Sequence, residues 1–206
     1  MQDLFVKGGP FMWPLLLMLF FGLVVAFERF YTLSKAQVNA KDFFAQIQEA
    51  FKQGGPEAAA EVCSNTRGPV ASVLHAGLLR LDRGLDHVEK AMTESGAVEM
   101  AFLEKGMVWL STVANIAPLL GFLGTVSGMI GAFESIAAAG DVEPSIVASG
   151  ISEALITTAA GLVIAIPIQA FHNYFVSKID KIIIDMQESS TLFMEELIQL
   201  GYGKDS

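Results

Sequence analysis

Apolar residues are concentrated in three blocks that polar segments separate. The blocks cover residues 10–27, 107–133 and 144–171; the first two contain no charged residue, and the third contains one, Glu153. A bilayer core of about 30 Å is crossed by about 20 apolar residues in a helix. Each block is therefore long enough to predict a transmembrane helix, with the first the shortest of the three.

The order of the blocks predicts seven segments. A signal peptide is the alternative reading of the first block, but a strong basic start is missing and Glu28-Arg29-Phe30-Tyr31 stands where small residues would mark cleavage. We therefore expect a retained helix there. The predicted segments are an external N-terminus (1–9), transmembrane helices at 10–30, 107–133 and 145–171, a cytoplasmic helical region (31–106), an external connection (134–144) and a cytoplasmic C-terminal helix (172–206).

Basic residues predict the orientation. The segment from residue 134 to 143 has no Lys or Arg, and the N-terminal segment has only Lys7. Lys and Arg mark the cytoplasmic side of short membrane loops. The N-terminus and the short connection are expected outside, and the basic middle segment and tail inside. The basic residues concerned are Arg29, Lys35, Lys41, Lys52, Arg67, Arg80, Arg83, Lys90, Lys105, Lys178, Lys181 and Lys204.

Both cytoplasmic segments have the apolar period of helices. A first helix is expected around residues 43–51 and is ended by Gly54-Gly55-Pro56. Apolar residues from Val73 to Val88 continue the period, and one long helix is expected to run from Asp86 into the second span. The tail carries an apolar stripe that predicts helix packing: Phe175, Ile179, Ile182, Ile183, Met186, Phe193, Leu197 and Leu200.

Composition narrows the function classes. The 206 residues are 52% hydrophobic and 17% charged, with a mean hydropathy of +0.49 and a net charge of −9. Such a chain is neither disordered nor built to bind nucleic acid, which needs clustered Lys and Arg. The single cysteine, Cys63, has no internal disulfide partner, and the sequence has no zinc-ligand spacing and no hydrolase or nucleotide-binding motif. We expect no enzyme activity, no cofactor and no metal.

Small residues are concentrated in the second and third spans. Membrane helices associate through small residues, because these let the backbones approach closely. The first span is built almost entirely of large side chains, so we expect it to face lipid and the other two to pack tightly. Two prolines are expected to kink their helices. The residues concerned are Gly121, Gly124, Gly128, Gly150 and Gly161, with Pro118 and Pro167.

Glu153 is the residue that most needs an explanation. A carboxylate in hydrocarbon costs at least ~2.5–3.5 kcal/mol, so it should face a cavity or a partner group. Thr157 lies one turn further along the helix with Thr158 beside it, and Thr125 provides a hydroxyl in the second span. These four residues predict a polar seam. The residues support two interpretations: an ion path, or a carboxylate that is hydrogen-bonded to a neighbouring helix.

Two motifs resemble the MotA/TolQ/ExbB proton-channel family. Residues 117–130 (APLLGFLGTVSGMI) resemble its second-span signature, and residues 150–162 (GISEALITTAAGL), continued through Ile166-Pro167, resemble its third-span signature. Glu28-Arg29, directly after the first span, also matches. Three spans with a large cytoplasmic connection resemble the ExbB/TolQ branch, since the MotA branch has four.

The resemblance implies an all-α fold that assembles as a homopentamer around a central pore in the bacterial inner membrane. The pore would hold a dimer of a single-span ExbD/TolR-like protein whose aspartate carries the proton, and proton motive force would be converted into work on a TonB/TolA-like protein. Thr158 matches the pore residue that faces this aspartate, and Thr125 matches its second-span counterpart. Glu153 matches a family glutamate that acts either as a relay or as a structural anchor.

Other readings stay open at the level of the sequence. Thr157 and Thr158 hydroxyls suit a partly dehydrated Na⁺, which would make a sodium-driven motor of the same architecture. A membrane scaffold that does not conduct ions is the alternative from another class. An intramembrane enzyme has less support, because Glu153 has no second catalytic group near it in the sequence. Nutrient uptake, envelope maintenance and gliding are all outputs that such a chain could energise.

Overall fold

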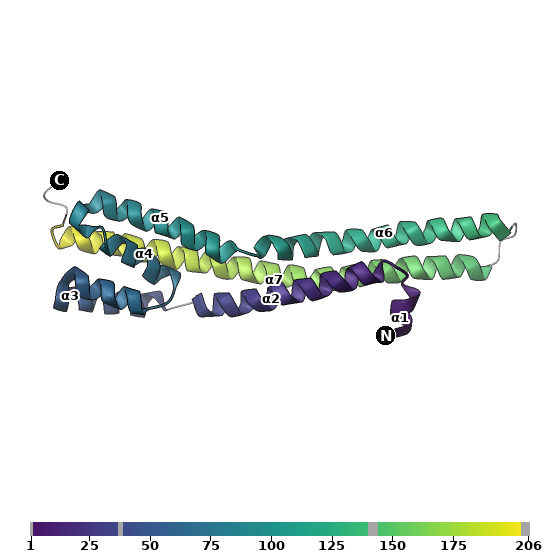
Figure 1. Ribbon diagram of the computed structural model, residues 1–206, viewed down its shortest axis with the longest axis horizontal. Helices are drawn as coiled ribbons and strands as arrows, with labels where there is room; N and C mark the ends of the chain where they lie inside the picture. Colours follow the sequence, from purple (N-terminus) through teal and green to yellow (C-terminus); the bar gives the residue numbers. More distant parts are fainter. Residues whose placement is uncertain (1, 37–38, 140–143, 203–206) are drawn as a thin grey trace. The chain divides into compact units, whose positions relative to one another are not determined.

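The computed structural model describes residues 2–36, 39–139 and 144–202, and these residues form helices joined by short turns (Figure 1). No strand occurs in these ranges. Met1, residues 140–143 of the expected external connection, and residues 203–206 of the expected C-terminal helix lie outside the described residues. The helices are α1 (Gln2–Lys7), α2 (Met12–Ala36), α3 (Ala40–Asn65), α4 (Pro69–Leu78), the 3-10 helix η1 (Leu81–Arg83), α5 (Leu85–Glu104), α6 (Met107–Ala139) and α7 (Pro144–Gln199).

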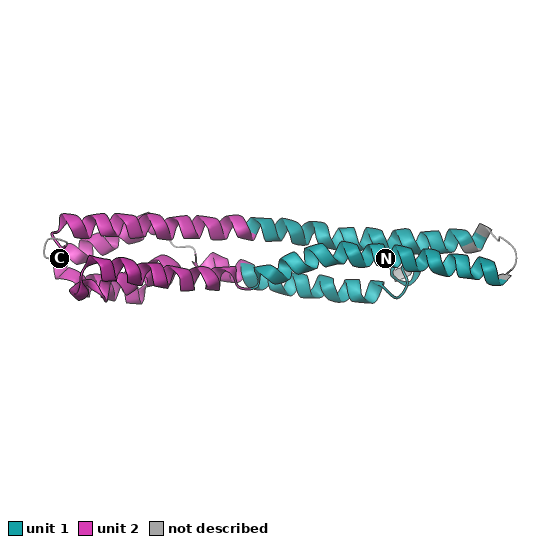
Figure 2. Cartoon of the chain, turned by 90° about the horizontal axis from the view of Figure 1, so that it is seen from above, with its two compact units in different colours: residues 1–29, 106–174 teal, residues 30–105, 175–206 magenta. Residues whose placement is uncertain are grey.

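The chain forms two compact units (Figure 2). Unit 1 contains residues 1–29 and 106–174, and unit 2 contains residues 30–105 and 175–206. In the described part of the chain, three helical stretches are long and apolar enough to cross a membrane; they lie within Met12–Asn65, Leu85–Ala138 and Val147–Gln199. The prediction of an all-α membrane protein with three apolar spans is therefore confirmed.

Unit 1 is built by α2 packing on α6 and α7. At Gly22 of α2, an added Cβ would lie 2.9 Å from Ile168 Cδ1 and 3.2 Å from Val113 Cγ1, so the three helices meet at this point. Leu15 is buried on the same helix. Several other large side chains of α2, such as Leu17 and Phe20, are exposed, which is the arrangement expected for a helix that faces lipid on one side.

Unit 2 buries an apolar core between α3, α4, α5 and the second half of α7. Phe175, Ile179, Ile182, Met186, Phe193 and Leu197 of the predicted tail stripe are buried. The stripe is shorter than predicted, because α7 ends at Gln199 and Leu200 is 47% exposed beyond it. Ile183 is half-buried and lines a cavity.

The expected long helix from Asp86 into the second span is wrong. The structure has two helices there, α5 ending at Glu104 and α6 beginning at Met107. Gly106 between them has a φ of +86°, a left-handed conformation that glycine adopts without the steric cost of a Cβ. The signal was present in the sequence as a glycine directly after a polar helix end, which is a common helix terminator.

The period from Val73 to Val88 is also not one helix. The chain turns at η1, and α4 then packs against α5. By contrast, the predicted break at Gly54-Gly55-Pro56 is confirmed, since Gly55 has non-helical backbone angles inside α3. The ends of the helices in the cytoplasmic segment are therefore set by local turn residues, and the apolar period alone does not predict them.

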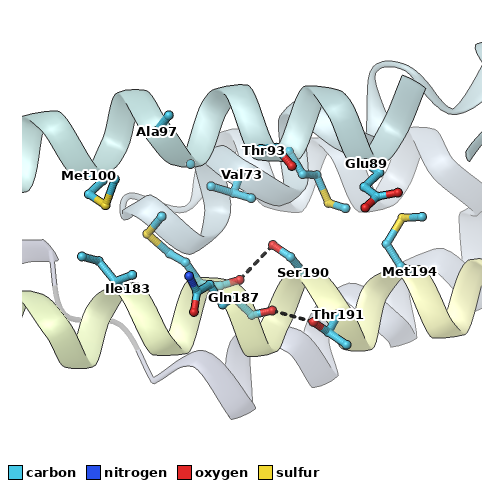
Figure 3. A pocket seen from close by; sticks show the side chains of 13 residues that line it. Val73, Glu89, Thr93, Ala97, Met100, Ile183, Gln187, Ser190, Thr191 and Met194 are labelled. Atoms are coloured by element: carbon cyan, nitrogen blue, oxygen red, sulfur yellow. Dashed lines mark hydrogen bonds between the residues drawn. The ribbon is translucent and has the colours of Figure 1, made fainter. Parts of the chain in front are cut away.

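An open cavity of about 760 Å³ lies within unit 2 between α5 and α7 (Figure 3). Four methionines line it, together with Val73 at its base: Met92, Met100, Met186 and Met194. Two hydroxyls at its edge form hydrogen bonds within their own helix, α7. Ser190 donates to Met186 O at 2.8 Å, and Thr191 donates to Gln187 O at 3.0 Å. The lining is therefore mixed, with the methionines beside the polar side chains of Glu89, Thr93 and Gln187.

Cys63 of α3 gives a test of the unit 2 core. Its side chain is 3% exposed, and burial raises the pKa of its thiol from 9.0 to about 12. At pH 8 the native protein should have a thiolate fraction roughly a thousandfold below that of the unfolded chain. We predict that iodoacetamide modifies Cys63 slowly at pH 8 and rapidly after denaturation, as followed by mass spectrometry.

The same pKa shift has a consequence for stability. Below pH 9 the thiol is neutral in both states, so the folded state keeps its full stability. Between pH 9 and about 12 the unfolded chain loses the proton and the folded chain does not, so the free energy of unfolding falls as the pH rises.

In the labelling experiment, rapid modification of native Cys63 by iodoacetamide at pH 8 would contradict the packing of α3.

Candidate functional site

The backbones of α6 and α7 touch in the membrane part of unit 1. An added Cβ at Gly161 would lie 2.6 Å from the carbonyl oxygen of Ala117, and one at Gly121 would lie 3.0 Å from the carbonyl oxygen of Thr157. These neighbours are backbone atoms, which cannot move aside as a flexible side chain can. Small residues are therefore a condition for this helix pair, as expected for association in lipid.

The other predicted packing glycines continue the contact towards the C-terminal end of α6 and the N-terminal end of α7. A Cβ at Gly124 would meet Thr157 Cγ2 at 2.4 Å, one at Gly128 would lie 3.2 Å from Gly150 O, and one at Gly150 would meet Ala132 Cβ at 2.5 Å. Both helices continue through Pro118 and Pro167. The contact therefore extends from Ala117 to Ala132 on α6 and from Gly150 to Gly161 on α7.

Thr125 and Thr158 meet across this contact. Their hydroxyls hydrogen-bond to each other, Thr158 Oγ1 donates to Gly121 O at 3.1 Å, and Thr125 Oγ1 is 3.1 Å from Ala154 O. Both side chains are half-buried. Two hydroxyls and two backbone carbonyls thus form a small polar group between helices that are otherwise apolar at this depth.

Thr157 and Glu153 lie at a different place, against the turn between α1 and α2. Thr157 is 1% exposed, and its hydroxyl is 2.8 Å from Gly8 O and 2.9 Å from Glu153 O. Gly9 has a φ of +69°, and a Cβ there would lie 1.9 Å from Glu153 Oε1, so only glycine fits beside this carboxylate. Among the residues that the structure describes, none donates a hydrogen bond to the Glu153 carboxylate.

The structure thus divides the four predicted residues between two sites. Thr125 and Thr158 form one site, and Glu153 and Thr157 form the other with the Gly8–Gly9 turn. Sequence reasoning did not find the turn. The adjacent glycines before the first span do indicate a tight turn, but nothing local connects them with residues 149 positions away.

Glu28 and Arg29 form an ion pair at the other end of the first span. Arg29 is 3% exposed, and its Nε is 2.6 Å from Glu28 Oε2. A Cβ at Gly106 would lie 3.4 Å from Arg29 Nε, so the guanidinium packs beside the start of α6. A buried guanidinium needs a counter-charge, and Glu28 supplies it.

No group of three His, Cys, Asp or Glu side chains positioned to hold a metal occurs in the described ranges. His75 and His87 belong to unit 2, and His172 lies near the end of the third span, in unit 1.

These features define a multi-pass all-α membrane protein with a polar pair between two tightly packed membrane helices. The profile of the MotA/TolQ/ExbB proton channel family matches residues 65–188. The chain therefore belongs to this family, and its relatives place it in the ExbB/TolQ branch.

Three relatives illustrate the similarity. A biopolymer transport protein ExbB homolog of Methanothermobacter thermautotrophicus is 30% identical over 86% of this chain and 63% of its own length. An ExbB-like protein of Synechocystis is 35% identical over 80% of this chain and 66% of its own length. The Tol-Pal system protein TolQ of Haemophilus influenzae is 35% identical over 56% of this chain and 50% of its own length. This chain spans less than two thirds of each of these relatives.

The backbone contact gives a test of the packing. We predict that Gly161→Ala destabilises the protein by about 1–3 kcal/mol, because the added methyl is forced against the carbonyl of Ala117. Gly131→Ala is the matched control: no atom lies within 4 Å of its added Cβ, and replacing a helical glycine contributes up to about 1 kcal/mol of stability. Unfolding of each variant by SDS in detergent micelles measures the difference. Equal stability of the two variants would contradict the contact.

Proposed function

We propose that this chain is the ring-forming subunit of a proton-driven motor in the inner membrane. In this proposal a homopentamer encloses an ExbD/TolR-like dimer, and proton flow at the Thr125–Thr158 pair drives movement that a TonB/TolA-like protein carries across the periplasm. The N-terminus is periplasmic and the C-terminus is cytoplasmic. The observation that carries the proposal is the hydrogen-bonded threonine pair between two apolar membrane helices.

The threonine pair is suited to passing protons but not to holding them. A hydroxyl both donates and accepts a hydrogen bond, so a proton can be transferred along a chain of hydrogen-bonded hydroxyls. Neither threonine ionises near neutral pH, so a titrating group must bind the proton at each step. Hydroxyls commonly hydrogen-bond across membrane helices, and this pair places a donor and an acceptor between α6 and α7.

The titrating group has to come from another chain. Within residues 107–133 and 144–171 the sequence has one acid, Glu153. Its carboxylate lies against Gly9, at the N-terminal turn, and not between Thr125 and Thr158. A partner with a membrane carboxylate would complete the site, which is the role that the family resemblance gives to an ExbD/TolR-like aspartate. Glu153 would then support the structure by fixing the N-terminal turn.

The available energy sets the kind of movement. One proton that crosses a potential of ~150 mV releases about 3.5 kcal/mol. This energy is enough to bias a step between neighbouring positions, but it is small beside the packing of α6 on α7. The partner dimer therefore turns within the ring, and the helix pair of each subunit stays closed.

Substitution of Thr158 tests the function. We predict that Thr158→Val lowers proton-driven output by about tenfold or more, because the methyl group cannot relay a hydrogen bond. Thr158→Ser is the matched control and should keep most of the output. Output is measured as proton uptake by vesicles that contain the complex, with assembly checked by co-purification of the partner. Full output from assembled Thr158→Val would contradict the proposal and favour a scaffold.

A sodium-driven motor is the second candidate. Thr125 Oγ1, Thr158 Oγ1 and the carbonyls of Gly121 and Ala154 bring four oxygens together, and Na⁺ prefers oxygen ligands. Replacing Na⁺ with K⁺ at a fixed membrane potential separates the two ions. Unchanged flux supports protons, and loss of flux supports sodium.

A further inference from the structure

A second polar cluster lies on α6 and α7, towards the predicted cytoplasmic side of the membrane. An open cavity of about 510 Å³ lies along α6 within unit 1, and His172 lines it from α7. Four of its lining side chains are polar: Ser111, Thr112 and Asn115 from α6, and His172 from α7.

Two residues of this cluster have the same sequence spacing from the two residues of the threonine pair. Ser111 precedes Thr125 by fourteen residues in α6, and His172 follows Thr158 by fourteen residues in α7. Fourteen residues are two heptads, which keep a residue on the same side of a packed helix pair. The two helices are antiparallel, so both steps lead in the same direction, by about 21 Å. Ser111 and His172 are therefore on the faces that carry Thr125 and Thr158, whereas Thr112, Asn115 and Ile116 extend the cavity further around α6.

The hydrogen bonds of His172 leave one ring nitrogen available. Gln169 Nε2 donates to Asn173 Oδ1 at 2.9 Å, and His172 Nδ1 is 3.4 Å from the same oxygen. An amide oxygen accepts and does not donate, so this contact is a hydrogen bond in the tautomer whose Nδ1 carries the hydrogen. Nε2 then has a lone pair and can take up a proton. Histidine is the side chain suited to proton exchange near physiological pH.

His172 is the one ionisable residue that lines the cavity. From α6 the cavity is faced by Met107, Val108, Ser111, Thr112, Asn115 and Ile116, none of which titrates. On α7 the neighbours Gln169 and Asn173 are neutral amides. The hydroxyl of Thr112 is 2.8 Å from Val108 O, and Asn115 Nδ2 is 2.8 Å from Ser111 O, so their own helix orders these groups.

We propose that this cavity is the cytoplasmic exit for protons and that His172 is its proton acceptor. The inference rests on the proposed function and adds a residue to it. In each transfer an O–H bond of an incoming hydronium breaks and an N–H bond forms at Nε2 of His172. The reverse step then releases the proton to cytoplasmic water, so that no group is oxidised or reduced.

The test uses the full chain, reconstituted in vesicles with its co-purified membrane partner. His172→Ala should slow proton flux about tenfold at pH 7 on the cytoplasmic side. Millimolar imidazole on that side alone should restore the flux, because the free ring replaces the missing acceptor in the cavity. His87→Ala, which removes a histidine of unit 2, is the control and should not change the flux.

Three results would overturn this role of His172. Unchanged flux in His172→Ala shows that the residue is not used, and slow flux without imidazole rescue shows a structural role only. In both cases the proposed function stands if the wild-type complex conducts protons and Thr158→Val does not. Absence of proton flux in the assembled wild-type complex would reject the proposed function and this inference together.

Discussion

The contact between the backbones of α6 and α7 is the constraint on which the rest of unit 1 depends. Gly161 lies against the carbonyl of Ala117, and Gly121 lies against Thr157 and Thr158. Since lipid is as apolar as leucine, bulky apolar side chains would gain little from association in the membrane. Close approach is what allows two short threonine side chains to reach each other across the helix pair. The packing and the polar site therefore have one cause.

Much of the fold could be predicted from the sequence. The three apolar blocks correspond to apolar helices, and most of the stripe on the tail corresponds to buried residues of α7. The break at Gly55 was predicted because glycine and proline stand together there. The break at Gly106 was missed, because the apolar and polar pattern on both sides is compatible with one helix. A single glycine in the left-handed conformation ended it.

Less of the site could be predicted, and the reason is physical. Glu153, Thr157, Thr158 and Thr125 were identified in the sequence because placing a polar side chain in the bilayer costs free energy. This free-energy cost does not indicate which partner each side chain contacts. Adjacent residues on a helix point about 100° apart, so Thr157 and Thr158 face different neighbours. One meets the carbonyl of Gly8, and the other meets Thr125. Contacts over such sequence distances depend on helix packing and not on local pattern.

In the proposed ring, Thr158 faces a water-containing interior of the assembled protein. Cysteine labelling tests it directly, since the native Cys63 is buried with a raised thiol pKa and should stay unreactive. In vesicles, Thr158→Cys in the assembled complex should react with a small charged methanethiosulfonate reagent. Val163→Cys, at a position of α7 that is 70% exposed on another side of the helix, should not react because it faces lipid or protein. Labelling at position 163 without labelling at position 158 would contradict the account.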